Sequence, residues 1–157
     1  MLQRPQSLFL ALIVVSMGLY LAFPVWQKTI GTESATLNAF ALTYTKGDQT
    51  VTSENTFYLA GLAIAGGLIA LASLLQFRNR VRQMFLNLIN TLVLVGLLGA
   101  STYLAHIRGN GLFAIETQGS FKIGFFVIAI ALLCNVAANR FIRWDEKKVK
   151  DAFGRLR

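Results

Sequence analysis

The chain has 157 residues, of which 55% are hydrophobic and only 14% carry a charge, and its formal net charge is +8. A soluble nucleic-acid-binding domain would spread its basic charge over a polar surface, so this composition indicates a membrane protein instead. The single cysteine, Cys134, excludes an intrachain disulfide, and the single histidine, His106, excludes a zinc site of the usual Cys and His spacing.

Four apolar segments follow one another along the chain. The first, residues 7–26, carries no charge and ends near Pro24 and Trp26, a helix-stopping residue close to an aromatic residue typical of membrane interfaces. Its length indicates a retained helix rather than a cleaved signal peptide. The other three segments have about the length that crosses a bilayer and cover residues 57–75, 84–105 and 121–138. The sequence therefore predicts an all-α membrane protein, a four-transmembrane-helix bundle over residues 1–138.

Basic residues predict the orientation of this bundle. The N-terminus, the loop "QFRNRVRQ" and the C-terminal residues 139–157 hold eleven of the fifteen Lys and Arg residues. Because basic loops stay in the cytoplasm, both termini are predicted to be cytoplasmic. This bias accounts for the basic charge, so we expect membrane lipids and other membrane subunits as partners, and no nucleic acid.

The C-terminal residues 139–157 also have a helical pattern. Apolar residues recur at helical spacing from Ile142 through Val149 to Leu156, which predicts a basic amphipathic helix. Such a helix lies against lipid headgroups or docks on a partner subunit, and the pattern fits both. The residues expected to make these cytoplasmic contacts are Arg4, Arg78, Arg80, Arg82, Arg140, Arg143, Lys147, Lys148 and Phe153.

The outer loops show strand patterns. Residues 43–45 and 50–52 are rich in Thr, Tyr and Val and flank a turn at Gly47, which predicts a β-hairpin. A third strand is predicted at residues 112–117, after a Gly-Asn-Gly turn. A lone hairpin is marginally stable, so we expect a small antiparallel sheet that caps the outer end of the bundle.

Polar and small residues within the apolar segments predict how the helices pack. Asn87, Asn90 and Asn135 are expected to form hydrogen bonds between helices, and no ionisable residue suited to a proton relay lies near the middle of a segment. Small residues spaced four apart predict close helix contacts. They are Gly61, Ala63, Ala65, Gly66, Gly67 and Ala70 in the second segment, and Gly96 and Ala100 in the third.

Both ends of the chain resemble a known family. "MLQRPQSLFL" at residues 1–10 and "ANRFIRWDEKKVKDAFGRLR" at residues 138–157, with the basic loop between them, resemble an uncharacterised family of small four-span inner-membrane proteins of the Bacteroidota. The resemblance implies a four-span fold and a compartment, the bacterial inner (cytoplasmic) membrane. It also implies that a shared role lies on the cytoplasmic face, where both matching ends are expected.

The residues favour a protein without catalytic activity. No nucleophile and base, Gly-rich phosphate loop or paired carboxylates can be found, and we expect no metal and no cofactor. His106 is interpreted as an interfacial hydrogen-bonding residue rather than a haem ligand. The sequence thus predicts a non-enzymatic accessory or scaffold subunit of a larger inner-membrane complex. A small transporter or channel, or an enzyme that uses His106, are the alternatives.

Overall fold

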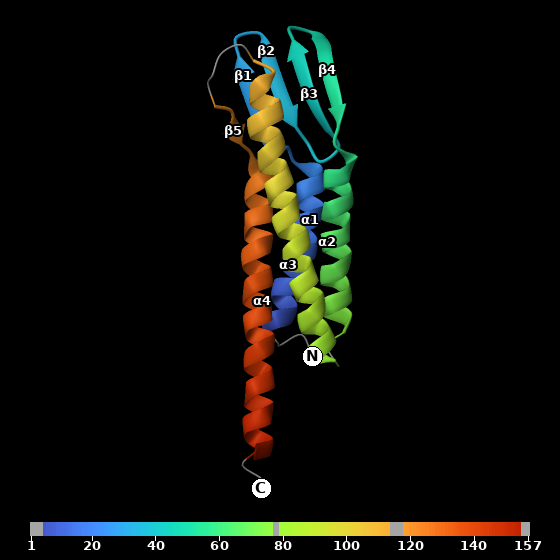
Figure 1. Cartoon of the computed structure of the whole chain (residues 1–157), viewed down its shortest axis with the longest axis vertical. Coiled ribbons are helices and arrows are strands. Elements are labelled where there is room, and N and C mark those ends of the chain that lie inside the picture. The colour runs from blue at the N-terminus through green and yellow to red at the C-terminus, as the bar shows by residue number, and fades with distance from the viewer. Residues whose placement is uncertain (1–4, 77–78, 114–117, 155–157) are drawn as a thin grey trace.

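A computed structural model describes residues 5–76, 79–113 and 118–154, without the side chains of residues 5, 145, 146 and 148–154. The molecule is an elongated rod, with a β-sheet at one end of a helix bundle and one helix projecting from the other end (Figure 1). Its helices are α1 (Pro5–Ala22), α2 (Phe57–Leu75), α3 (Arg80–Tyr103), which continues into a π-helical segment η1 (Leu104–Gly109), and α4 (Ile123–Gly154).

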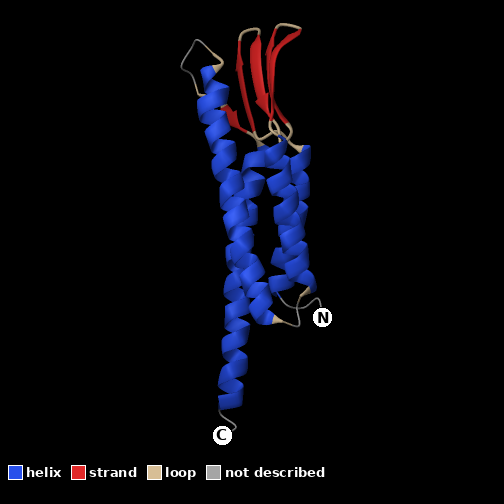
Figure 2. Cartoon of the chain, turned by 45° about the vertical axis from the view of Figure 1, so that its right-hand side comes forward, coloured by secondary structure: helices blue, strands red, loops and turns tan. Residues whose placement is uncertain are grey.

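The helices pack side by side, with α1 between α2 and α4 and with α3 between the same two helices. The chain runs away from the sheet in α2 and α4 and towards it in α1 and α3, and all four helices lie along the long axis of the rod (Figure 1 and Figure 2). A short connection joins α2 to α3, where the Asn79 side chain caps α3 by accepting a hydrogen bond of 3.3 Å from the Arg82 backbone nitrogen. Both chain ends lie at this end of the bundle, opposite the sheet.

Three helical stretches among the described residues are long and apolar enough to cross a membrane. They are residues Phe57–Leu75, Arg80–Gly109 and Ile123–Trp144. The first predicted segment does not reach residue 26 as a helix, because α1 ends at Ala22 and the chain enters a strand at Trp26. The residue before a proline disfavours helical backbone, so Pro24 ends α1 and leaves a shorter apolar helix.

The second part of the molecule is a five-stranded antiparallel sheet in the order β4-β3-β2-β1-β5. The strands are β1 (Trp26–Ile30), β2 (Glu33–Leu37), β3 (Ala41–Lys46), β4 (Gln49–Asn55) and β5 (Ser120–Phe121). The prediction of an all-α, four-transmembrane-helix bundle is therefore wrong, because residues 26–55 form four of the five strands of a sheet and the described apolar stretch of α1, Gln6–Ala22, is shorter than a spanning helix.

Two glycine turns set the register of the sheet. Gly31 and Gly47 have φ angles of 58° and 59°, in the left-handed region that glycine adopts without steric cost, and each opens a tight hairpin turn. The hairpin predicted around Gly47 is confirmed as β3 and β4. The third strand was predicted at residues 112–117, but Leu112 and Phe113 lie in a turn and bend, and residues 114–117 are outside the described residues. The strands beside the hairpin are β2 and β1 instead.

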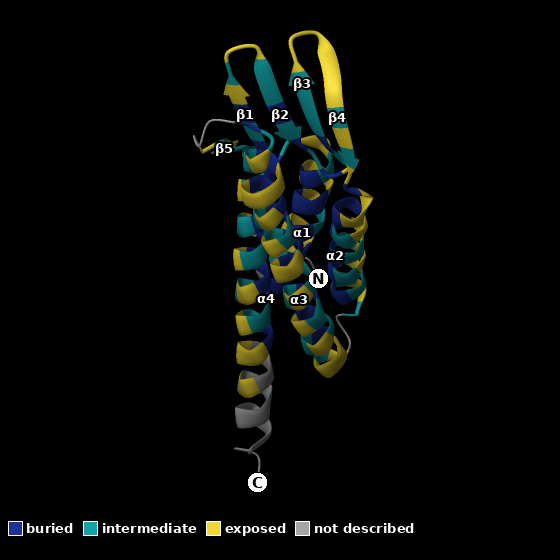
Figure 3. Cartoon of the chain, turned by 45° about the horizontal axis from the view of Figure 1, so that its top comes forward, coloured by how far each residue is buried: buried dark blue, intermediate teal, exposed yellow. Residues whose placement is uncertain are grey.

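Trp26 joins the sheet to the helices. The indole of this first β1 residue is 1% exposed and packs against Gly109 at the end of η1 and Gly119 before β5. A Cβ on Gly109 would lie 2.6 Å from the ring, so only glycine allows this approach. Figure 3 shows that burial falls across the sheet, from β2, which is intermediate to buried, to the edge strand β4, which is exposed at most positions.

Candidate functional site

One face of α3 carries a buried stripe that has three amide side chains in its first half and two leucines and a serine in its second half. Its residues recur at alternating spacings of four and three, so they stay on the side that faces the other helices. From the end of α3 farthest from the sheet they are Gln83, Asn87, Asn90, Leu94, Leu97 and Ser101, and all are at most 1% exposed. The polar half therefore lies in the part of the bundle opposite the sheet.

Asn135 of α4 ties this stripe to a second helix. Its Nδ2 atom donates hydrogen bonds to the Thr91 hydroxyl at 2.8 Å and to the backbone oxygen of Asn87 at 3.0 Å. The Asn90 amide donates to Asn135 Oδ1 at 3.5 Å. Ser73 of α2 donates to the Asn87 side chain at 2.9 Å, so this amide cluster joins three helices.

Three polar atoms of the stripe have no hydrogen-bond partner. They are Gln83 Oε1, Asn87 Nδ2 and Asn90 Oδ1, each buried from solvent. Buried amides without partners destabilise a fold unless ordered water or a ligand satisfies them. The amide cluster therefore holds the helices in one register and keeps spare hydrogen-bonding capacity, two acceptors and one donor.

The small residues of α2 allow two close helix approaches. A Cβ on Gly66 would lie 3.4 Å from Asn90 Oδ1, and a Cβ on Gly67 would lie 3.4 Å from Met17 of α1. Neither Gly61 nor Gly96 has a neighbouring atom within 4 Å of such a position. Ala63 and Ala70 are fully buried, whereas Ala65 and Ala100 are half-buried.

His106 and Cys134 differ in their exposure to solvent and do not form a common site. His106 is exposed on η1, with its ring 6.0 Å from that of Phe121, whereas Cys134 is buried on α4. In the same π-helical segment, Arg108 forms an ion pair of 3.6 Å with Glu54 of β4. Within the described parts of the chain, no three His, Cys, Asp or Glu residues are grouped so as to hold a metal ion.

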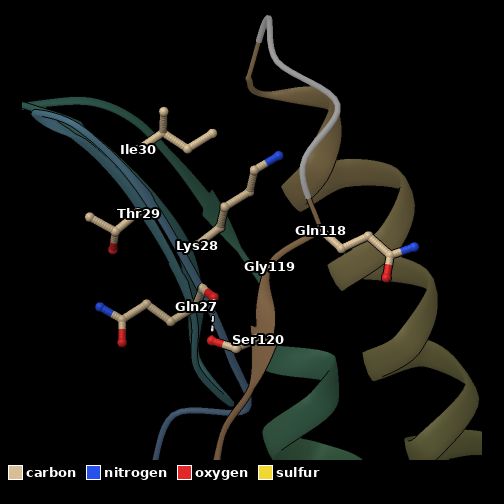
Figure 4. Close-up of a pocket in the computed structure, with 7 residues that line it drawn as sticks. All are labelled: Gln27, Lys28, Thr29, Ile30, Gln118, Gly119 and Ser120. Atoms are coloured by element: carbon tan, nitrogen blue, oxygen red, sulfur yellow. Dashed lines mark hydrogen bonds between the residues drawn. The ribbon is translucent and has the colours of Figure 1, made fainter.

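A pocket of about 530 Å³ opens where β1 meets β5 (Figure 4). Gln27 to Ile30 form one wall and Gln118 to Ser120 the other, and the Ser120 hydroxyl donates to the Gln27 carbonyl at 3.3 Å. Lys28 is 3% exposed, and its Nζ lies 4.5 Å from the centre of the Phe113 ring, which holds the cation by a cation–π contact.

The basic positions lie at the end of the bundle opposite the sheet. Arg82, Arg140, Arg143 and Lys147 are exposed, and Arg80 is half-buried with its Nη1 atom buried and unpartnered. Arg4, Arg78 and the side chains of Lys148 and Phe153 are outside the described residues.

The whole chain matches one protein family, described as a domain of unknown function, DUF4293, over residues 2–156. The chain belongs to the DUF4293 family. No curated protein matches it.

In this DUF4293 protein, several site residues were not found by sequence reasoning. Gln83, Ser73 and the pair Tyr20 and Ser101, whose hydroxyls lie 3.2 Å apart, all take part in or extend the polar interior. The spacing of residues 83, 87, 90, 94, 97 and 101 is a signal that would have found Gln83 and Ser101. Ser73 and Tyr20 have no such signal, because their partners lie on other helices.

Proposed function

We propose that this DUF4293 protein is a non-enzymatic accessory or scaffold subunit of a bacterial inner-membrane complex. The rod has three parts, a sheet, an apolar helix bundle and a projecting helix. In this proposal the bundle lies in the membrane, and the sheet and the projecting helix lie on its two sides. The amide cluster supports a rigid bundle, because it satisfies polar groups by bonds between helices.

The projecting part of α4 is the observation that carries this proposal. The helix runs without a break from Ile123 to Gly154, past the ends of the other helices, and Lys147 in this part is exposed. A helical stretch that packs on no other part of its own chain is only marginally stable in water. A helix that extends this far past the bundle therefore favours the interpretation that it packs on another subunit.

The charges support an orientation with the projecting helix in the cytoplasm. Arg80, Arg82, Arg140, Arg143 and Lys147 surround this end, and basic residues near the ends of membrane helices remain on the cytoplasmic side. The sheet then faces the opposite side of the membrane.

The test compares the size of the assembly that contains the full chain with the size of the purified chain and of a truncated chain. The tagged full chain, expressed at its natural level and extracted in mild detergent, should migrate in a native gel well above the size of the purified 17.3 kDa chain. A chain that ends at residue 147 should lose this larger assembly while keeping the helical circular dichroism of the bundle. A second copy with a different tag separates a mixed complex from a homo-oligomer. Migration of the full chain at its purified size would contradict the proposal.

A small transporter or channel is the second candidate, and the unpartnered atoms of Gln83, Asn87 and Asn90 favour it. Polar groups inside a membrane bundle line solute paths in transporters. Leu94 and Leu97, both fully buried, follow this polar stretch and would close such a path. Leu94→Ser should then increase the water or glycerol permeability of reconstituted vesicles, whereas a scaffold would show the same permeability as vesicles with the unchanged chain.

A further inference from the structure

A groove of about 460 Å³ lies between α3 and α4 near the basic end of the bundle. Leu88 and Thr91 of α3 form one wall. The other wall is one face of α4, with residues at spacings of three and four: Val136, Asn139, Arg140, Arg143 and Trp144.

The groove changes from apolar to cationic along its length. Leu88 and Val136 are more than half exposed although they are apolar, and they lie within two of the helical stretches that are apolar enough to cross a membrane. Trp144 ends the second of these stretches, and Arg140 lies over its ring at 5.7 Å. A tryptophan beside arginines is typical of the boundary between the acyl chains and the headgroups of a bilayer.

The two arginines of the groove, Arg140 and Arg143, are not paired with a carboxylate in the part of the chain whose side chains are described. A guanidinium binds the oxygens of a phosphate by charge-assisted hydrogen bonds, so an anion of this class is complementary to the groove.

Asn139 adds a requirement for a hydrogen-bond donor. Its Oδ1 atom is buried in the groove wall and has no partner, and an oxygen acceptor of this kind repels phosphate. When the Asn139 side chain turns into the groove, a ligand that carries an O–H or N–H beside its phosphate satisfies this oxygen.

From these features we infer that the groove is a binding site for one phospholipid whose phosphodiester headgroup carries a hydroxyl donor, such as phosphatidylglycerol. The phosphate lies between Arg140 and Arg143, a headgroup hydroxyl donates to Asn139, and an acyl chain runs along Leu88 and Val136. This site depends on the membrane placement of α3 and α4 and is independent of the scaffold role.

The test measures quenching of Trp144 fluorescence in the full chain reconstituted into vesicles. Brominated phosphatidylglycerol should displace phosphatidylcholine from the groove with a preference of at least several-fold. The quenched signal is assigned to Trp144 by its loss in Trp144→Phe.

Two double variants separate the groove from general surface charge. Arg140→Gln with Arg143→Gln should lower the preference for phosphatidylglycerol by about tenfold. Arg82→Gln with Lys147→Gln removes the same charge from the same end, outside the groove lining, and should keep most of the preference. Equal losses in the two variants would overturn the site and leave only an unspecific attraction of anionic lipids.

Asn139→Ala tests the donor requirement without a change of charge. The unchanged chain should prefer phosphatidylglycerol over phosphatidylmethanol, which has the same charge and no hydroxyl, by about fivefold. The variant should bind both alike. Equal binding of both lipids by the unchanged chain would exclude the headgroup contact. Competition by millimolar inorganic phosphate or glycerol phosphate would show a site for free phosphate and overturn the lipid assignment, as would occupation of the groove by a second copy of the chain.

Discussion

The Asn135 amide of α4 donates a hydrogen bond of 2.8 Å to the Thr91 hydroxyl of α3, and the same hydroxyl donates at 2.9 Å to the backbone oxygen of Asn87. Two residues 44 positions apart are thus joined in a chain of hydrogen bonds inside an apolar bundle. Such bonds fix which faces of two helices meet, because any rotation or shift of α4 breaks them.

Asn135→Ala should destabilise the bundle by about 0.6 to 2 kcal/mol, the range for hydrogen bonds between membrane helices. It removes the donor to both Thr91 and Asn87. The measurement is the unfolding equilibrium in mixtures of sodium dodecyl sulfate and mild detergent, followed by circular dichroism.

Thr91→Val and Thr102→Val form a matched pair for the same question. The Thr91 hydroxyl accepts a hydrogen bond from α4, whereas the Thr102 hydroxyl donates to the backbone oxygen of Leu98 within α3. The first variant should lose stability and the second should change little. Equal effects would mean that the bond between helices contributes nothing beyond the change of side chain.

Gly109→Ala should destabilise the junction between the sheet and the helices by about 1 to 3 kcal/mol through overpacking. The new methyl group would overlap the Trp26 ring, which is fully enclosed and has no room to shift. Thermal unfolding followed by Trp26 fluorescence, in a Trp144→Phe background, measures the effect.

The control for this change is Gly111→Ala, two residues later, where no atom lies within 4 Å of the added Cβ. Alanine favours helical backbone over glycine, so this variant should be neutral or slightly stabilising. If Gly109→Ala were neutral as well, the packing of Trp26 against η1 would be looser than the structure has it.

The sheet should loosen in acid and in strong base. Glu33 of β2 lies opposite Lys46 of β3, with Oε1 2.9 Å from Nζ. Hydrogen bonds from Lys46 and then Tyr44 lower the pKa of Glu33, and the bond to Glu33 raises the pKa of Lys46. The Glu33 contribution is present above its unfolded-state pKa and is lost as the pH falls through the lowered folded-state pKa. The Lys46 contribution is present below its unfolded-state pKa and is lost as the pH rises through the raised one.

The loss of stability in acid is measured as the midpoint temperature of unfolding, followed by Trp26 fluorescence at several values between pH 3 and pH 7. Glu33→Gln should flatten this dependence, whereas Asp48→Asn, a change in the neighbouring hairpin turn, should leave its slope in place. An unchanged slope in Glu33→Gln would show that another group controls the acid response.

The proposed orientation predicts opposite labelling of the two ends of the rod. In a Cys134→Ser chain, a cysteine at Thr50 of β4 should react with an impermeant maleimide in intact spheroplasts. A cysteine at Lys147 of α4 should react only after the membrane is opened. The reverse pattern would place the sheet in the cytoplasm.

Local patterns in the sequence were enough for several elements. The apolar runs at residues 57–75 and 121–138 predict helices that the structure contains, with α4 extending to Gly154, and the turn at Gly47 predicts the β3–β4 hairpin. The strands β1 and β2 were missed because Trp26 was assigned to the preceding helix and because residues 27–37 are mostly small and polar, without a strong apolar alternation.

The sequence by itself determined the membrane-like composition, the long apolar helices and the glycine turn, because each depends on residues close together in the chain. The tertiary structure decided the hydrogen-bond partners of Asn135, the packing of Trp26 against Gly109 and Gly119, and the groove that Leu88 and Arg143 line. These depend on contacts between residues about 45 to 90 positions apart. Spacing along a helix predicts which face is buried, but the neighbour that meets this face depends on how all the helices and the sheet pack together.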